Sequence, residues 1–254
     1  MNRIVLVTGG GTGLGKAVAA RFRADGDTVI ITGRNEARLV TTADEIGALP
    51  ITCDATDPRQ VSRLAGEAGP DLDVLVNMAG GNTDFVRPPR QNSTGQDPGQ
   101  NSGQDGDLED VAAAWRANLD ANLLSAVLTT TAVLGSLRAG GSIINIGSIG
   151  AEYASSSYGA SKAALAAWTA GLSAQVGPKG LTANVISPGY TAGTGFFHDR
   201  LTEQRLTALI GATHDGRAGQ PADIAETAWF LASAGARHIT GQNLHVNGGA
   251  HTTR

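Results

Sequence analysis

Short apolar runs alternate with longer helical patterns along almost the whole chain, and this alternation restricts the possible folds. The runs are rich in β-branched residues and uninterrupted, which is typical of strands covered on both faces. We expect strands at residues 4–7, 28–32, 51–54, 74–76, 142–146, 182–186 and 243–246. We expect helices at residues 14–24, 35–46, 58–68, 108–137, 158–176 and 221–232. The order predicts an α/β fold with a doubly wound parallel sheet of about seven strands and helices on both faces.

The length of 254 residues suits one large core, so we expect a single domain over residues 1–254. In such a sheet ligands bind in the crevice at the carboxyl ends of the strands. The residues that directly follow each strand are therefore the candidates for a site.

Charge and composition exclude several classes of protein. The net charge is −4 and the basic residues are scattered, so we expect neither nucleic acid nor an anionic membrane as partner. The longest apolar runs have the length of strands, well short of the roughly 20 residues of a spanning helix. The chain starts with a strand and a glycine loop rather than a signal peptide, so we expect a cytoplasmic protein. The single cysteine, Cys53, excludes disulfides and is expected to be buried.

Residues 81–107 interrupt the alternation. In this segment 23 of 27 residues are Gly, Asn, Gln, Asp, Pro, Ser or Thr, too few apolar side chains to offset the entropy of ordering. We expect a flexible insertion at the mouth of the crevice, either a tolerated surface loop or a flap over the substrate.

A glycine loop, TGGGTGLG at residues 8–15, lies between the first strand and the first helix. Gly9, Gly13 and Gly15 stand where a backbone turns sharply, approaches a pyrophosphate and lets helix pack on strand. The N–H groups of a helix starting near Leu14 would face the phosphates. This arrangement is typical of a Rossmann-type dinucleotide site. A P-loop would need a Ser or Thr for magnesium where this chain has Ala17.

Tyr158 and Lys162 stand four residues apart on one predicted helix, so both lie on one face of it. A neighbouring ammonium is expected to lower the pKa of a phenol toward the working range of an acid–base catalyst. Ser148 follows a buried strand at the crevice edge and can donate to a carbonyl oxygen. Asn122 interrupts a helical pattern, as a polar helix position or as a functional kink.

These motifs together resemble the short-chain dehydrogenase/reductases of about 250 residues, in particular 3-oxoacyl reductases. The resemblance covers essentially the whole chain: TGGGTGLG at 8–15, VNMAG at 76–80, the Asn122 region, IGS ending at Ser148, YGASK at 158–162 and SPG at 187–189.

The resemblance implies a catalytic tetrad of Asn122, Ser148, Tyr158 and Lys162. Tyr158 would be the general acid in carbonyl reduction, Ser148 would orient the carbonyl, and Lys162 would bind the nicotinamide ribose and lower the pKa of Tyr158. Asn122 would hold the water of a proton relay, a role for which Asn118 competes. Two departures stand out: Met78 replaces an asparagine of the family, and the interval from Ser148 to Tyr158 is a few residues short.

The resemblance also implies the cofactor contacts. Besides the three glycines they comprise Thr12, Leu14, Arg34, Asp54, Ala55, Asn77, Ala79, Gly80, Tyr158, Lys162, Pro188, Gly189 and Thr194, with Thr191 as the alternative to Thr194. We expect no metal ion, because the five histidines show no ligand spacing.

The cofactor preference is predicted from the end of the second strand. An NAD enzyme normally offers an acidic side chain there, whereas this chain has Gly33 and then Arg34, which can pair with a 2′-phosphate. We therefore expect NADP(H) rather than NAD(H).

The predicted function is an NADP(H)-dependent oxidoreductase that interconverts a ketone and a secondary alcohol. The alternative is a catalytically silent protein that binds or senses NADP(H). Residues 190–215 resemble a substrate loop, in which Phe196 and Phe197 form an apolar lid or pack in the core. The wide apolar faces of the two longest predicted helices, and the last strand, lead us to expect a homodimer or homotetramer.

Overall fold

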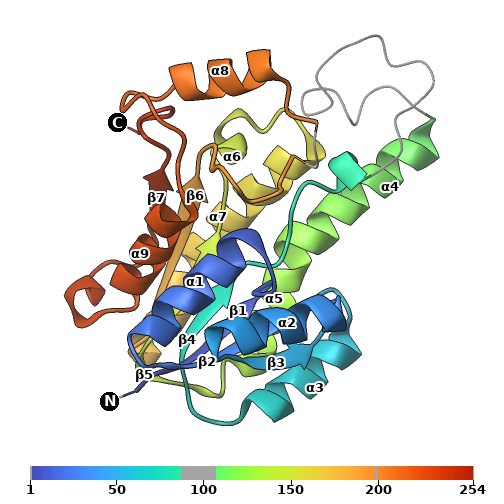
Figure 1. Cartoon of the computed structure of the whole chain (residues 1–254). Coiled ribbons are helices and arrows are strands. Elements are labelled where there is room, and N and C mark those ends of the chain that lie inside the picture. Colours follow the sequence, from blue (N-terminus) through green and yellow to red (C-terminus); the bar gives the residue numbers. More distant parts are fainter. Residues whose placement is uncertain (1, 87–106, 198–199, 254) are drawn as a thin grey trace.

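The computed structural model describes residues 2–86, 107–197 and 200–253 and contains one parallel sheet of seven strands (Figure 1). The order across the sheet is β3-β2-β1-β4-β5-β6-β7. Their bounds are β1 Ile4–Thr8, β2 Thr28–Gly33, β3 Leu49–Thr52, β4 Leu72–Asn77, β5 Leu137–Ile146, β6 Thr182–Pro188 and β7 Asn243–Val246. The chain winds from β1 out to β3 and returns to place β4 beside β1. The predicted doubly wound fold is confirmed, and its switch point lies between β1 and β4.

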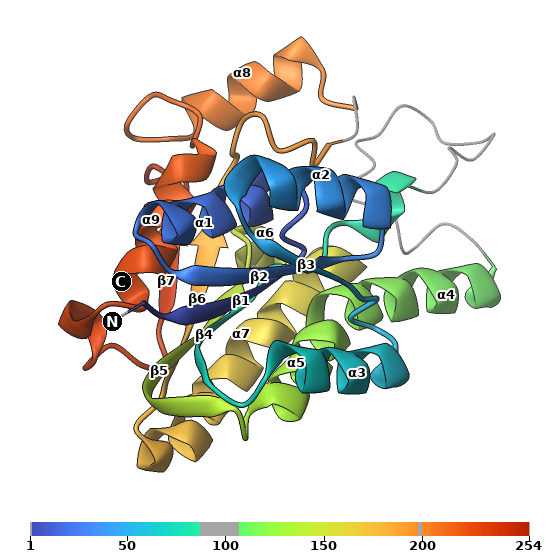
Figure 2. The same cartoon turned by 60° about the horizontal axis from the view of Figure 1, so that its bottom comes forward.

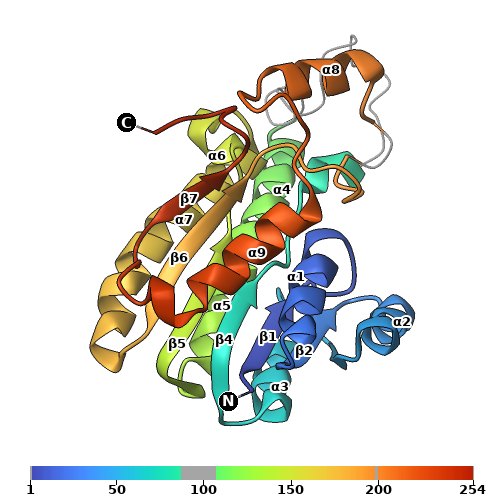
Figure 3. The same cartoon turned by 60° about the vertical axis from the view of Figure 1, so that its left-hand side comes forward.

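Helices cover both faces of the sheet (Figures 2 and 3). They are α1 Gly13–Ala24, α2 Glu36–Ile46, α3 Pro58–Ala68, α4 Leu108–Leu119, α5 Ser125–Val133, α6 Gly150–Tyr153, α7 Ser157–Val176, α8 Glu203–Gly211 and α9 Pro221–Leu231. Side chains of β1 alternate between two cores: Val5 and Val7 pack with α1, α2 and α9, and Leu6 packs with α3, α5 and α7. Both faces of the sheet are therefore covered by apolar cores, as the uninterrupted apolar runs predict.

The predicted helix at 108–137 is wrong in two respects. A π-helical turn at Asp120–Leu124 separates α4 from α5, and α5 ends at Val133. Leu137 instead begins β5 and pairs with Leu72 of β4. Gly135 and Ser136, both poor helix formers, explain why the helix stops before them.

Smaller differences concern the third strand and the loops. The strand predicted at 51–54 begins two residues earlier, because Asp54 belongs to a turn in which its carboxylate accepts hydrogen bonds from the Thr56 amide (3.0 Å) and hydroxyl (2.7 Å). Within the loop predicted at 190–215, residues 203–211 form α8, whose first turn Thr202 caps by accepting from the Arg205 amide.

Among the described residues, no helix combines the length and apolarity needed to cross a membrane. Cys53 is buried, as predicted.

Most of the predicted insertion, residues 87–106, lies outside the described residues. Its described beginning is packed rather than flexible, which corrects the prediction there. Phe85 is buried, and the Asn118 side chain accepts a hydrogen bond from the Thr83 amide (3.1 Å). The apolar pair at 85–86, counted as an exception in the composition, marks the end of this ordered piece.

Candidate active site

The glycine loop turns at the switch point, directly after β1. Gly9 has φ +67°, and a Cβ atom there would come within 2.9 Å of the Ala79 Cα atom. A Cβ atom on Gly15 would lie 2.1 Å from the Gly9 carbonyl oxygen. The spacing of these glycines therefore lets α1 start against the loop and lets the loop touch the segment after β4.

The first turn of α1 presents free backbone donors to the crevice. Thr12 is its N-cap and makes no side-chain capping bond, while Gly13, Leu14 and Gly15 form the first turn. The N–H groups of a first turn have no partner within the helix and carry a partial positive charge. This end of α1 is therefore suited to a pyrophosphate.

The segment after β4 is held against the glycine loop by a residue that the sequence analysis did not single out. The hydroxyl of Thr8, the last residue of β1, accepts hydrogen bonds from the amides of Met78 (3.1 Å) and Ala79 (3.0 Å). Thr8 is buried, and its position opposite Asn77 in the parallel pairing makes the contact possible. Only the strand register, which the sequence does not reveal, identifies this role.

Asn77 itself points into the interior. Its side-chain amide donates to Asn145 Oδ1 (2.8 Å) and to the Thr130 hydroxyl (2.9 Å), and the residue is buried. Asn145 continues the network to the Thr169 hydroxyl (2.8 Å). The Asn77 side chain thus links the strands under the site, and only its backbone remains for a contact in the crevice.

Ser148, Tyr158 and Lys162 come together beside β5 and β6. The Ser148 hydroxyl hydrogen-bonds the phenol of Tyr158 and accepts from the Gly150 amide (3.0 Å). The ammonium of Lys162 donates to the Ile146 carbonyl (2.7 Å) and lies 6.0 Å from the centre of the Tyr158 ring. α7 carries the last two on one face, as the four-residue spacing predicts, and the Ser156 hydroxyl caps it at the Gly159 amide.

The expected lowering of the Tyr158 pKa does not hold in this structure. Desolvation raises the pKa of Tyr158 to about 12, and the hydrogen bond with Ser148 offsets this only in part. Burial also lowers the pKa of Lys162 to about 8, so the ammonium is itself costly to keep charged. Spacing alone does not show how strongly the surroundings desolvate both groups. At neutral pH the phenol is therefore a proton donor and the lysine is mostly protonated.

Asn122 lies in the π-helical turn between α4 and α5. Its amide group donates to the carbonyls of Gly81 and Asn118, and its Oδ1 atom accepts from the Gly81 amide, all at 3.0 Å. Gly80 has φ +143°, and a Cβ atom there would lie 2.6 Å from Asn122 Oδ1. The interruption of the helical pattern at Asn122 therefore corresponds to a π-helical turn, and the Asn122 side chain anchors the loop after β4. Asn118, one turn earlier, instead donates to the Ser157 hydroxyl (2.9 Å) at the start of α7.

Two exposed arginines lie beside the carboxyl end of β2. Arg34 directly follows β2, and Arg38 lies in the first turn of α2, which Asn35 caps by accepting from the Arg38 amide (3.0 Å). Within the described part of the chain, neither guanidinium forms an ion pair or hydrogen bond. Arg38 was not among the predicted site residues, although its place one turn into the capped helix could have indicated it. The neighbouring strand β3 is followed by the Asp54 turn and the buried Ala55.

The loop after β6 lies on the other side of β1 and β4 from Arg34. Pro188 ends β6 and accepts at its carbonyl from the Ile149 amide (2.9 Å), while the Gly189 amide donates to Val246 (3.1 Å). The Thr194 carbonyl lies 3.0 Å from where a Cβ atom of Gly13 would be. Thr191 is buried and forms an isolated bridge with Gly219, so Thr194 is the threonine beside the glycine loop.

Aromatic side chains of this loop pack directly on Tyr158. The ring of Phe196 lies 5.6 Å from the Tyr158 ring and 5.6 Å from that of Phe85, measured between centres. Phe197 contacts Phe196 at 5.1 Å and Tyr190 at 5.9 Å. Of the two alternatives left open by the sequence, this geometry favours an apolar cover over the Tyr158 phenol.

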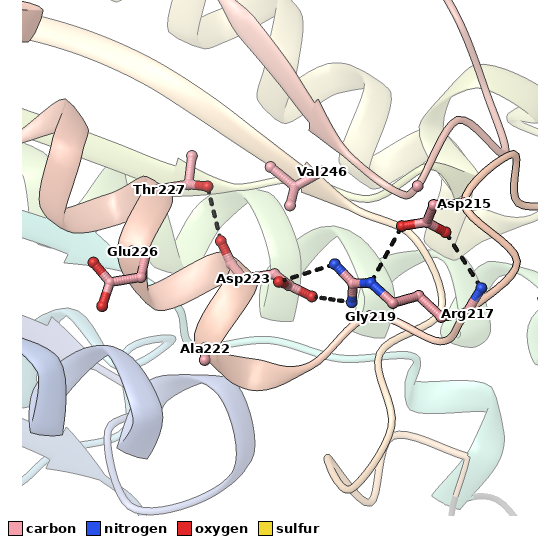
Figure 4. Close-up of a pocket in the computed structure, with 9 residues that line it drawn as sticks. Asp215, Arg217, Gly219, Ala222, Asp223, Glu226, Thr227 and Val246 are labelled. Carbon is pink, nitrogen blue, oxygen red and sulfur yellow. Dashed lines mark hydrogen bonds and ion pairs between the residues drawn. The ribbon is translucent and has the colours of Figure 1, made fainter.

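A separate cavity of about 380 Å³ lies between α9 and the end of β7 (Figure 4). Its walls include three carboxylates and one guanidinium, and Arg217 already pairs with Asp223 (2.7 Å) and Asp215 (3.4 Å). The excess of negative charge makes this cavity a poor site for a phosphate. None of the predicted site residues lines it.

The whole chain is similar to known oxidoreductases. Residues 9–251 match the sequence profile of the family described as enoyl-(acyl carrier protein) reductase. A Mycobacterium tuberculosis protein named only as an oxidoreductase is 37% identical over 246 residues, 97% of each chain. The 3-oxoacyl-[acyl-carrier-protein] reductase FabG of Rickettsia felis is 32% identical over 251 residues, 96% of this chain and 95% of the relative. A solved short chain dehydrogenase from Burkholderia cenocepacia, in complex with NADP, gives a TM-score of 0.81 at 30% identity and covers 98% of this chain and 97% of that one.

Proposed function

Because the chain belongs to the short-chain dehydrogenase/reductase family of oxidoreductases, we propose that it interconverts a ketone and a secondary alcohol with NADP(H). The observation that carries the proposal is the convergence of Ser148, Tyr158 and Lys162 at one crevice with the glycine loop. The bound cofactor would supply or accept the hydride. The protein would supply the proton and the alignment of the carbonyl.

The crevice fits a dinucleotide. Side chains are missing where the backbone must come close, at Gly9, Gly13 and Gly15, and the start of α1 has uncapped donors. In the proposed complex Thr12, Leu14, Ala79 and Gly80 would line the pyrophosphate, Asp54 and Ala55 would lie toward the adenine, and Pro188, Gly189 and Thr194 would lie toward the nicotinamide.

In the direction of reduction, Tyr158 would donate its proton to the carbonyl oxygen while the carbonyl carbon receives the hydride. The hydroxyl of Ser148 would donate a hydrogen bond to the same oxygen as negative charge develops there. A Tyr158 pKa of about 12 keeps the phenol protonated before the step. The protonated Lys162 beside it would stabilise the phenolate that forms, which then takes a proton from solvent.

Arg34 supports NADP(H) over NAD(H). Its guanidinium is exposed and unpaired in the described part of the chain, at the end of β2 where an NAD enzyme offers a carboxylate. The free Arg38 adds a second positive charge. A related solved structure holds NADP, which supports the same choice.

The substrate proposed is a 3-oxoacyl thioester or a similar ketone with an apolar chain. The cover formed by Phe85 and Phe196 over Tyr158 suits an apolar group next to the carbonyl. Relatives named as 3-oxoacyl-[acyl-carrier-protein] reductases support the same class. A cytoplasmic location and a dimeric or tetrameric state remain predictions from the sequence.

The experiment is a panel of ketones and 3-oxoacyl thioesters with the full-length protein, followed by the loss of NADPH absorbance. We expect turnover of at least one apolar ketone, with alcohol formed in equal amount to the NADPH consumed. Tight NADPH binding without turnover of any member would favour the catalytically silent alternative and contradict the proposal.

A further inference from the structure

Three potential metal ligands meet at the edge of the sheet, outside the crevice residues described above. Glu152 lies in α6, His245 in the edge strand β7, and His251 in the tail that follows β7 (Figure 3 shows these elements side by side). One ligand atom from each lies within 4.8 Å of the others. Glu152 and His245 are 93 positions apart, so no local motif in the sequence predicts this group.

The separations suit a metal ion better than they suit hydrogen bonds. His245 Nε2 lies 3.4 Å from Glu152 Oε1, and His251 Nε2 lies 3.7 Å from Oε2. Both exceed the 2.7–3.2 Å of ordinary N–H···O hydrogen bonds. Two ligands of a tetrahedral ion with bonds of about 2.0–2.1 Å stand about 3.4 Å apart. Small side-chain movements would bring all three atoms to that geometry.

Burial adds a second, independent observation. The side chain of His245 is only 10% exposed, and its Nδ1 atom is buried without a hydrogen-bond partner. Glu152 and His251 are 28% and 26% exposed, so water can still reach the space between them. The ring is therefore held with Nδ1 in the interior and Nε2 toward the Glu152 carboxylate, so Nε2 is the nitrogen available to a metal ion.

We propose that Glu152, His245 and His251 bind one divalent transition-metal ion, with water in the fourth position. Two imidazoles and one carboxylate are the ligands that Zn²⁺ accepts in sites with three protein ligands. Ca²⁺ and Mg²⁺ prefer oxygen ligands alone, so the two imidazoles argue against both.

The ion would join α6 to the tail of the chain. α6 begins at Gly150, whose amide donates to the Ser148 hydroxyl, so the site supports the turn that carries Ser148. Asn243 lies between the same carboxylate and β6: its Nδ2 atom is 3.4 Å from Glu152 Oε1, and its Oδ1 atom accepts from the Ser187 hydroxyl (2.7 Å). The role inferred is structural, and it does not depend on which reaction the crevice performs.

The test uses EDTA-treated, tag-free, full-length protein titrated with Zn²⁺ in competition with a chromogenic chelator. We expect one Zn²⁺ per chain with a Kd of about 1 µM or tighter. Glu152→Gln and His251→Asn should each weaken binding at least about 100-fold. The control His238→Asn changes an exposed histidine without a side-chain partner in the described structure and should bind as the unaltered protein does. Absence of stoichiometric binding, or equal affinity in all variants, would overturn the proposal.

A second measurement avoids variants that fail to fold. Diethyl pyrocarbonate modifies accessible imidazoles, and peptide mass spectrometry reports which ones. In the unaltered protein, added Zn²⁺ should protect His251 several-fold while His238 reacts as before. Equal modification of His251 with and without Zn²⁺ would contradict the assignment.

Discussion

Arg34 gives the most specific prediction about the cofactor. Its guanidinium follows β2 directly, is exposed, and has no partner among the described residues, so it is free to pair with a 2′-phosphate. Arg34→Ala should weaken NADPH binding and leave NADH binding nearly unchanged. Arg34→Asp should do more, because a carboxylate repels the 2′-phosphate and can accept hydrogen bonds from the ribose hydroxyls of NADH.

The magnitude follows from one charge-assisted contact. A hydrogen bond to a charged group contributes about 1.5–3 kcal/mol, and exposure to water and salt places this one at the lower end. Since 1.4 kcal/mol corresponds to tenfold, Arg34→Ala should lower the ratio of kcat/KM for NADPH to that for NADH by about 10- to 30-fold. Arg38, also unpaired, would retain part of the attraction for the 2′-phosphate, so Arg34→Ala should not abolish the preference for NADPH.

The assay compares KM and kcat for both cofactors at one ketone concentration and fixed ionic strength. Arg116→Ala is the matched control, since Arg116 is an exposed arginine in α4 without a described side-chain partner. Selectivity that stays unchanged in both Arg34 variants would refute the argument from the end of β2.

Three further predictions concern the rest of the crevice. Burial lowers the pKa of Lys162 to about 8, so its ammonium loses its proton as the pH rises through that value. The kcat/KM for reduction should therefore fall above about pH 8. The residual kcat/KM of Lys162→Arg should not fall there, because a guanidinium stays protonated. Gly15→Ala should lower the free energy of unfolding by about 1–3 kcal/mol in urea, because the new methyl would lie 2.1 Å from the Gly9 carbonyl, whereas Gly171→Ala, with open space in α7, should raise it by about 0.5–1 kcal/mol. Phe196→Ala should lower kcat/KM for long-chain ketones by about tenfold and leave acetone little affected; equal effects on both would contradict the apolar cover.

The fold was predictable because most local patterns have a single consistent interpretation. Apolar runs that alternate with capped helices require a parallel sheet, and all seven predicted strands are present. The differences arise where local patterns compete. Leu137 continues an apolar helical pattern, yet pairing with Leu72 in the sheet takes precedence.

The meeting of Ser148, Tyr158 and Lys162 was predictable, but the pKa values of these groups were not. The positions of Ser148, Tyr158 and Lys162 follow from helix spacing and from the place of strand ends. The pKa of Tyr158 does not, because desolvation depends on the rings and backbone that surround it in space. For the same reason, no spacing rule could identify the hydroxyl of Thr8 or the meeting of Glu152 with two distant histidines.

Proton donation by the Tyr158 hydroxyl is the central step of the proposed reaction, and a variant that lacks only this hydroxyl tests it. Tyr158→Phe should lower kcat/KM for reduction by about 10²- to 10⁴-fold while NADPH still binds, as measured by fluorescence titration. Tyr153→Phe, which removes an exposed hydroxyl, should keep full activity. A Tyr158→Phe protein that reduces ketones at the rate of the unaltered protein would contradict the role of Tyr158 as proton donor.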